Sequence, residues 1–164
     1  MLGSDLVMYE EEFKLIDAEL NRLLAQANGK VVFLVDKNGQ LIAATGETEN
    51  LDTTSLASLT AGNIAATGGM AKLLGEKEFS ILFHEGQRDN IHISIISQRI
   101  ILVVIFDQRS SLGLVRLRVK KSAEVLGAIF GQLLQKVESG KGAGKSGDSP
   151  FAEITDEDID KLFG

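Results

Sequence analysis

Residues 30–45, KVVFLVDKNGQLIAAT, contain two short apolar runs on either side of an Asn-Gly pair. The first run, Lys30–Asp36, and the second, Gln40–Thr45, have the length and the β-branched content that are typical of strands. Asn and Gly tolerate the positive φ angles of a tight hairpin turn, so the segment predicts an antiparallel hairpin.

The rest of the chain supplies three more strands and three helices. Short β-branched runs separated by turn residues predict strands at Phe79–His84, Ile91–Ile96 and Arg99–Phe106. The last of these is continuously apolar and is therefore expected at the centre of the sheet. Apolar residues spaced by three or four predict helices at Met8–Ala27, at Asp52–Gly75 and from Ser110 or Ser111 to Val137. The order α-β-β-α-β-β-β-α predicts an α/β fold of the α+β type, in which a five-stranded antiparallel sheet has two helices on one face and one on the other.

The acidity of the chain is concentrated at its C-terminal end. The net charge is −6, and the residues from Gly147 onward carry six acids against one base. The preceding residues are nearly neutral, which argues against nucleic acid as the main partner. We expect a domain at residues 1–138, a flexible Gly/Ser/Lys linker at 139–150 and an acidic amphipathic docking helix at 151–164.

The composition also excludes several kinds of site. The chain contains no cysteine, so it has no disulfide, no thiolate metal site and no cysteine nucleophile. Its first residues lack the basic and apolar regions of a signal peptide, and its longest apolar run, Ile100–Phe106, is too short to cross a bilayer. We expect a cytoplasmic protein without membrane insertion.

The predicted helix at 52–75 has two unlike sides. One side is expected to pack into the core and contains Leu56, Leu59, Ala66, Met70, Leu73 and Leu74. The other side lacks the long charged residues of a solvent-facing helix and contains Thr54, Ser58, Ala61, Ala65, Gly68, Gly69 and Lys72. Each glycine costs about 1 kcal/mol relative to alanine in a helix interior. We therefore expect this side to be a docking surface, and a helix from a second copy of the chain is a compatible occupant.

Two further patterns suggest ligand binding, and each has a simpler explanation. Residues 139–146, SGKGAGKS, resemble a P-loop, but they lack its first glycine and its strand–loop–helix context, so a spacer is favoured. His84 and His92 lie near the ends of a predicted hairpin, and two metal ligands without a third favour solvated side chains. No catalytic residue, metal site or cofactor is expected.

Basic residues cluster around the start of the third helix. They are Arg109, Arg116, Arg118, Lys120 and Lys121. The residues at 118, 120 and 121 are predicted to point away from the apolar stripe of that helix. A solvated surface is the simpler interpretation, and an electrostatic surface for an acidic partner, including the chain's own tail, is the functional one.

The C-terminal segment combines acids with large apolar residues. The apolar residues are Phe151, Ile154, Ile159, Leu162 and Phe163. A tail that only aids solubility is one interpretation. A tethered docking motif is favoured because the segment is more apolar than solubility requires.

Four segments resemble the Roadblock family of dynein-type light chains, and most closely its bacterial members. They are KVVFLVDKNGQLIAATG, DTTSLASLTAGNIAATGGMAKLLGE, HEGQRDN and RIILVVIFDQRSSLGLVRLRVKK. The likeness extends from Tyr9 to Val137 and includes the acidic terminal helix. It implies a homodimer whose sheets join edge to edge. It also implies that the paired second helices contact a Ras-like small GTPase, MglA, with two chains for each GTPase.

The resemblance further implies an activator of GTP hydrolysis that acts in the polarity of gliding or twitching cells and is enriched at a cell pole. The docking surface carries over to Ser58, Ala61, Ala65, Gly68, Gly69 and Lys72. This side has no arginine, so we expect activation to be indirect, and the tail is expected to dock on a second site of the GTPase. The rivals are a Roadblock scaffold without activating function and a PAS-like small-molecule sensor, which the bare helix disfavours.

Overall fold

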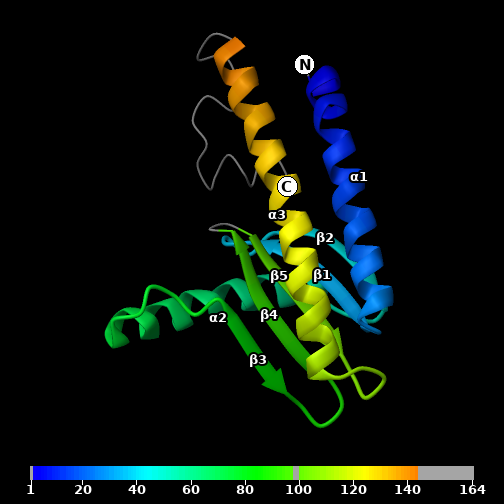
Figure 1. Cartoon of the computed structure of the whole chain (residues 1–164), viewed down its shortest axis with the longest axis vertical. Helices are drawn as coiled ribbons and strands as arrows, with labels where there is room; N and C mark the ends of the chain where they lie inside the picture. The colour runs from blue at the N-terminus through cyan, green and yellow to red at the C-terminus, as the bar shows by residue number, and fades with distance from the viewer. Residues whose placement is uncertain (1, 98–99, 144–164) are drawn as a thin grey trace.

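The computed structural model describes residues 2–97 and 100–143, which form three helices and five strands (Figure 1). In chain order these are α1 (Leu2–Gln26), β1 (Val31–Asp36), β2 (Leu41–Gly46), α2 (Thr53–Leu74), β3 (Ile81–Glu85), β4 (Asn90–Ser97), β5 (Ile100–Phe106) and α3 (Leu112–Ala143). The predicted fold class and order of elements are confirmed. Helix α3 continues to Ala143 and so includes the first residues of the predicted linker.

The five strands form one antiparallel sheet in the order β2-β1-β5-β4-β3. The hairpin predicted at residues 30–45 is present as β1 and β2, with Gly39 in its turn at a φ angle of 91°. Asp36 fixes this turn, because its carboxylate accepts hydrogen bonds of 2.9 Å from the backbone N–H groups of Asn38 and Gln40. Strand β5 lies at the centre of the sheet, as its sequence predicts, and all of its residues are buried.

Helices cover both faces of the sheet. Helices α1 and α3 pack together on one face, and α2 lies on the other (Figure 1). Successive side chains of a strand point to opposite faces, so Leu102 and Val104 of β5 join the core under α1 and α3, whereas Val103 and Ile105 join the core under α2. Across residues 2–97 and 100–143, each helix is too short or too polar to serve as a membrane-spanning segment.

Polar contacts fasten α1 to α3. The buried carboxylate of Glu12 forms an ion pair of 2.8 Å with Lys136. Further along α1, Glu19 accepts a hydrogen bond of 2.7 Å from the hydroxyl of Ser122. Because residues early in α1 contact residues late in α3, the two helices run antiparallel, as Figure 1 also shows.

His92 of β4 is buried on the face of the sheet that α3 covers. Its side chain is 1% exposed, and neither ring nitrogen has a hydrogen-bond partner among the residues described. Burial and the nearby positive charge of Arg116 hold the pKa of His92 below its ordinary value of 6.5. The sequence pattern favoured a solvated side chain, which is wrong for His92 because its ring lies on the face of the sheet that α3 covers.

We predict that His92 makes the protein less stable as the solution becomes acidic. The unfolded chain takes up a proton at His92 near pH 6.5, whereas the folded chain takes it up only at lower pH. The free energy of unfolding therefore falls as the pH decreases below that value, by at most about 1.4 kcal/mol per pH unit for one proton. Urea unfolding at about pH 7.5 and about pH 5.5, at one protein concentration, measures this change.

The variant His92→Leu should remove this part of the pH dependence. The matched control is His84→Leu, which changes the exposed histidine on the neighbouring strand and keeps His92, so this variant should still lose stability with acid. The same loss of stability with acid in wild type and in His92→Leu would contradict the assignment.

Candidate functional site

Helix α2 has well-defined ends. Asp52 caps its N-terminus by accepting hydrogen bonds from the backbone N–H and the hydroxyl of Ser55, at 3.0 and 2.7 Å. These bonds lower the pKa of Asp52, and the hydroxyl contributes most. Gly75 ends the helix in the left-handed conformation, with φ at 79°, and its N–H bonds to the carbonyls of the last turn. The two caps fix the length over which α2 can present side chains.

The side of α2 that packs on the sheet is made mainly of small residues. The buried residues of the helix are Ala57, Thr60, Ala61 and Ala71. Leu56 and Ile64 are partly buried against the same cluster of strand residues. Small side chains let the helix lie close to the sheet, and a Cβ placed on Gly39 would come within 3.1 Å of the Cα of Ser58. The β1–β2 turn therefore packs against the backbone of α2.

The apolar side predicted to face the core is mostly exposed, so that part of the sequence prediction is wrong. The exposed fractions are 70% for Leu59, 59% for Met70, 89% for Leu73 and 68% for Leu74. Ala66 is exposed as well, and only Leu56 packs on the core as predicted. The C-terminal end of α2 extends past the edge strand β3 (Figure 1), which leaves its last two turns without cover from the sheet.

The predicted docking residues fall into two groups. The exposed ones are Thr54, Ser58, Ala65, Gly69 and Lys72. Of the other two, Ala61 is 9% exposed and lies toward the sheet, and Gly68 is half-buried. Apart from Lys72, the exposed group forms a row of small side chains, and the row of large apolar residues runs beside it on the same helix. We call the two rows together the α2 surface.

The glycines of α2 have no packing role inside the described part of the chain. A Cβ built on Gly62, Gly68 or Gly69 meets no atom within 4 Å. The helix-weakening effect of these residues is thus not offset by a close contact with their own chain.

A hydrogen bond joins α2 to the edge of the sheet. The side-chain amide of Asn63 lies 2.9 Å from Nε2 of His84 on β3. The spacing of residues 63 and 84 in the sequence does not indicate this contact. His84 pairs with Ile91 across the hairpin and His92 pairs with Phe83, so the two histidines point to opposite faces of the sheet. They cannot share a metal ion, and the residues described contain no group of three or more possible metal ligands.

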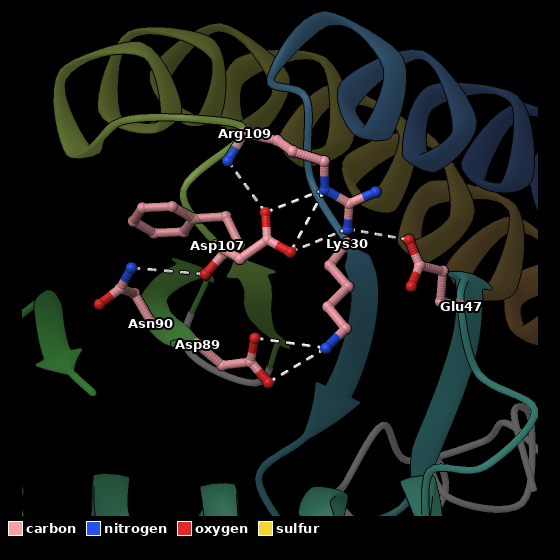
Figure 2. Close-up of polar contacts among 7 residues, drawn as sticks. Lys30, Glu47, Asp89, Asn90, Asp107 and Arg109 are labelled. Atoms are coloured by element: carbon pink, nitrogen blue, oxygen red, sulfur yellow. Dashed lines mark hydrogen bonds and ion pairs between the residues drawn. The ribbon is translucent and has the colours of Figure 1, made fainter. Parts of the chain in front are cut away.

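An ion-pair network closes one end of the sheet (Figure 2). Arg109 donates to both Asp107 and Glu47, at 2.9 and 3.0 Å, and Lys30 donates to Asp89 at 3.2 Å. Hydrogen bonds from Arg109 lower the pKa of Asp107 to about 2, and the same contacts raise the pKa of Arg109. Arg109 is therefore engaged in holding the loops after β2 and β5 together.

The other predicted features lie away from the α2 surface or outside the described residues. The basic residues of α3 lie on the opposite face of the sheet from α2, as expected; Arg116, Lys120 and Lys121 are exposed. Arg118 is only half-exposed, and its Nε is buried, so it does not point fully away from the apolar stripe. The SGKGAGKS segment is helical as far as Ala143. The tail docking residues, from Phe151 to Phe163, lie outside the described residues.

We predict opposite effects from adding a methyl group at two glycines. Gly39→Ala should lower the free energy of unfolding by about 1–2 kcal/mol, because its φ angle is positive and the methyl would press on α2. Gly69→Ala should raise it by about 1 kcal/mol, because the position is helical and surrounded by open space. Urea denaturation of both variants at one concentration tests the pair. A destabilised Gly69→Ala would show that another chain already covers this position.

Comparison with known proteins identifies close relatives of this fold. The pattern of the Roadblock/LC7 domain matches residues 15–106. Myxococcus xanthus MglB is 62% identical, with a TM-score of 0.70 over 71% of this chain and 95% of that chain. The gliding protein MglB of Thermus thermophilus is 30% identical, with a TM-score of 0.69 over 72% of this chain and 90% of that chain.

A third structure, described as MglB with a tetrameric arrangement, is also 30% identical, with a TM-score of 0.69 over 72% of this chain and 89% of that chain. No curated protein matches the chain. The domain match covers more than half of the sequence, and the identity with a solved structure is high over most of it. The chain therefore belongs to the Roadblock/LC7 family.

Proposed function

We propose that a homodimer of this chain is the GTPase-activating partner of the Ras-like GTPase MglA and that it acts in cell polarity and gliding or twitching motility. The observation that carries the proposal is the exposed α2 surface in a member of this family whose relatives include MglB proteins. Roadblock proteins of this kind are regulators, so the chemistry of hydrolysis belongs to the GTPase.

The α2 surface suits a switch segment of a GTPase. Its small row, with Ser58, Ala65 and Gly69, lets a partner backbone approach the helix without steric conflict. Its large apolar row supplies buried area once it is covered, at roughly 25 cal/mol per Å². Few charged groups have to be desolvated, because Lys72 is the only charged residue of α2.

We propose that a second copy of the chain covers the exposed apolar residues at the edge of the sheet. Ile81 and Phe83 of the edge strand β3 are 51% and 37% exposed, and the exposed end of α2 extends past this edge. An exposed edge strand with apolar residues is a template for pairing with another strand. Dimers joined at β3 would place two α2 helices side by side, so that two chains contact one GTPase. The tetrameric arrangement of a relative supports self-association.

The proposed mechanism of activation is indirect. An arginine finger reaches into the GTPase site from outside, and α2 contains no arginine. Arg109 is engaged by Asp107 and Glu47, and the basic residues of α3 lie on the opposite face of the sheet. We propose that the α2 surface holds the switch segments so that the Arg and Gln of the GTPase itself reach the γ-phosphate.

We predict that Ala65→Arg and Gly69→Arg each abolish stimulated GTP hydrolysis by MglA. Both positions are exposed, so the variants should fold and dimerise, while the long side chain keeps the switch backbone away from the helix. The matched control is Ala25→Arg, at an exposed position of α1 on the other face of the sheet. Phosphate release from MglA with each variant measures the effect.

Retained stimulation by Ala65→Arg and Gly69→Arg would overturn the α2 surface as the docking site. Binding of wild type to MglA without any stimulation would favour the scaffold function instead of activation.

We predict that single alanine substitutions of Arg116, Arg118, Lys120 and Lys121 change the stimulated rate by less than about tenfold. Loss of an arginine finger costs about 10³ to 10⁵ in rate, and these residues lie on the face opposite α2. Single-turnover hydrolysis at saturating protein measures the rate. A thousandfold loss in any one of the four variants is incompatible with indirect activation.

A further inference from the structure

A groove runs between α1 and α3 on the face of the sheet opposite the α2 surface. Its volume is about 460 Å³, and α1 contributes Leu15 and Ala18 to its wall. From α3 come Val125, Ala128 and Ile129. Leu15 is 49% exposed, although it belongs to the interface between two packed helices. The groove is therefore an apolar surface that the described part of the chain does not cover.

One end of this groove is basic. Arg22 is part of the groove wall and forms an ion pair of 2.7 Å with Glu19, which also lines the groove, so the excess positive charge at this end comes from α3. Glu19 binds Ser122, so Arg22, about one turn further along α1, lies at the level of the first turns of α3. Lys121 and Arg118 precede Val125 by one and two helical turns and lie on the same side of α3. The Nε of Arg118 is buried and has no hydrogen-bond partner within the described ranges.

The end of α3 places the rest of the chain within reach of the groove. At 1.5 Å per residue, the groove residue Gln132 is about 17 Å along α3 from Ala143. Residues 144–154 span up to roughly 36 Å when extended. A segment that begins near Thr155 can therefore turn back and lie along the groove, antiparallel to α3, with its last residues toward the basic end.

We propose that the acidic C-terminal segment, residues 151–164, occupies the groove between α1 and α3 of its own chain. Ile159, Leu162 and Phe163 recur at helical spacing and match the apolar wall. The acids Asp156, Glu157, Asp158 and Asp160 precede Leu162 and Phe163, so the antiparallel course leaves them nearer the Gln132 end of the groove, while the apolar residues meet its wall. The tether raises the local concentration of the segment at the groove, so a short contact suffices. This site is distinct from the α2 surface and does not depend on the function proposed above.

A spin label at the last residue tests the proposal in the full chain. The natural sequence contains no cysteine, so Gly164→Cys directs the label to one place. The expected result is a selective loss of amide NMR intensity at the groove, around residues 15–22 and 121–132, without any GTPase present. Uniform weak losses, or losses centred on α2, would overturn the proposal.

Matched variants distinguish docking in the groove from other causes of lost NMR intensity. Ala128→Glu places an acid in the groove wall and should restore the intensities. Gln135→Glu adds the same charge at an exposed position of α3 outside the wall and should not. Leu162→Ser should restore the intensities and Ala152→Ser should not, which tests the segment without altering the folded domain.

Two further samples distinguish other occupants. Isotope-labelled chain without a spin label, mixed with spin-labelled unlabelled chain, should show no loss of intensity at the groove; a loss there would mean that the segment docks on a second copy. A loss that appears only after addition of MglA, and on MglA, would assign the segment to the GTPase and overturn docking on this chain.

Discussion

The packing of α2 against the sheet depends on small side chains, and the exposed surfaces of the protein follow from it. Ala57 and Ala61 are buried on the inner side of α2, while larger residues of the strands, such as Phe33 and Ile101, fill the interface from the sheet side. The helix can lie close to the sheet only with this side inward. Rotation of α2 to bury Leu59 and Met70 would insert long side chains into a space that fits a methyl group. The two rows of the α2 surface are outward for this reason.

The two faces of the sheet are covered in different ways. The face under α1 and α3 buries large aliphatic and aromatic side chains from both helices and is fastened by Glu12 and Glu19. The face under α2 receives few large side chains from its helix. A partner that contacts α2 therefore meets a helix held by a thin layer of contacts, a cap at each end and the bond between Asn63 and His84. This arrangement leaves most of the surface of α2 available for contact with a partner protein.

Sequence periodicity is enough to predict the helices and strands, but it does not predict which side of α2 is buried. The hairpin at 30–45, the central position of β5 and the apolar stripe of α3 could all be predicted, because each is a local pattern with one physical interpretation. The row that contains Leu59 and Met70 could not be assigned, since periodicity marks residues that avoid water without saying whether their own chain covers them. The recurrence of Ala57, Ala61 and Ile64 was the available indication of the sheet-facing side. The burial of His92 depends on strand order, and no local pattern carries that information.

The energetics of α2 point to cover from outside the chain. Gly62, Gly68 and Gly69 together weaken the helix by about 3 kcal/mol relative to alanine, and their surroundings within the described chain are open. Full burial of Leu59, Met70, Leu73 and Leu74 would contribute roughly 1.5–3 kcal/mol for each side chain. Burial of only part of that row would therefore stabilise the helix by more than the adjacent glycines destabilise it. A helix that is weak alone and stabilised on contact is what a docking surface requires, because the small residues that weaken it are also those that let a partner approach.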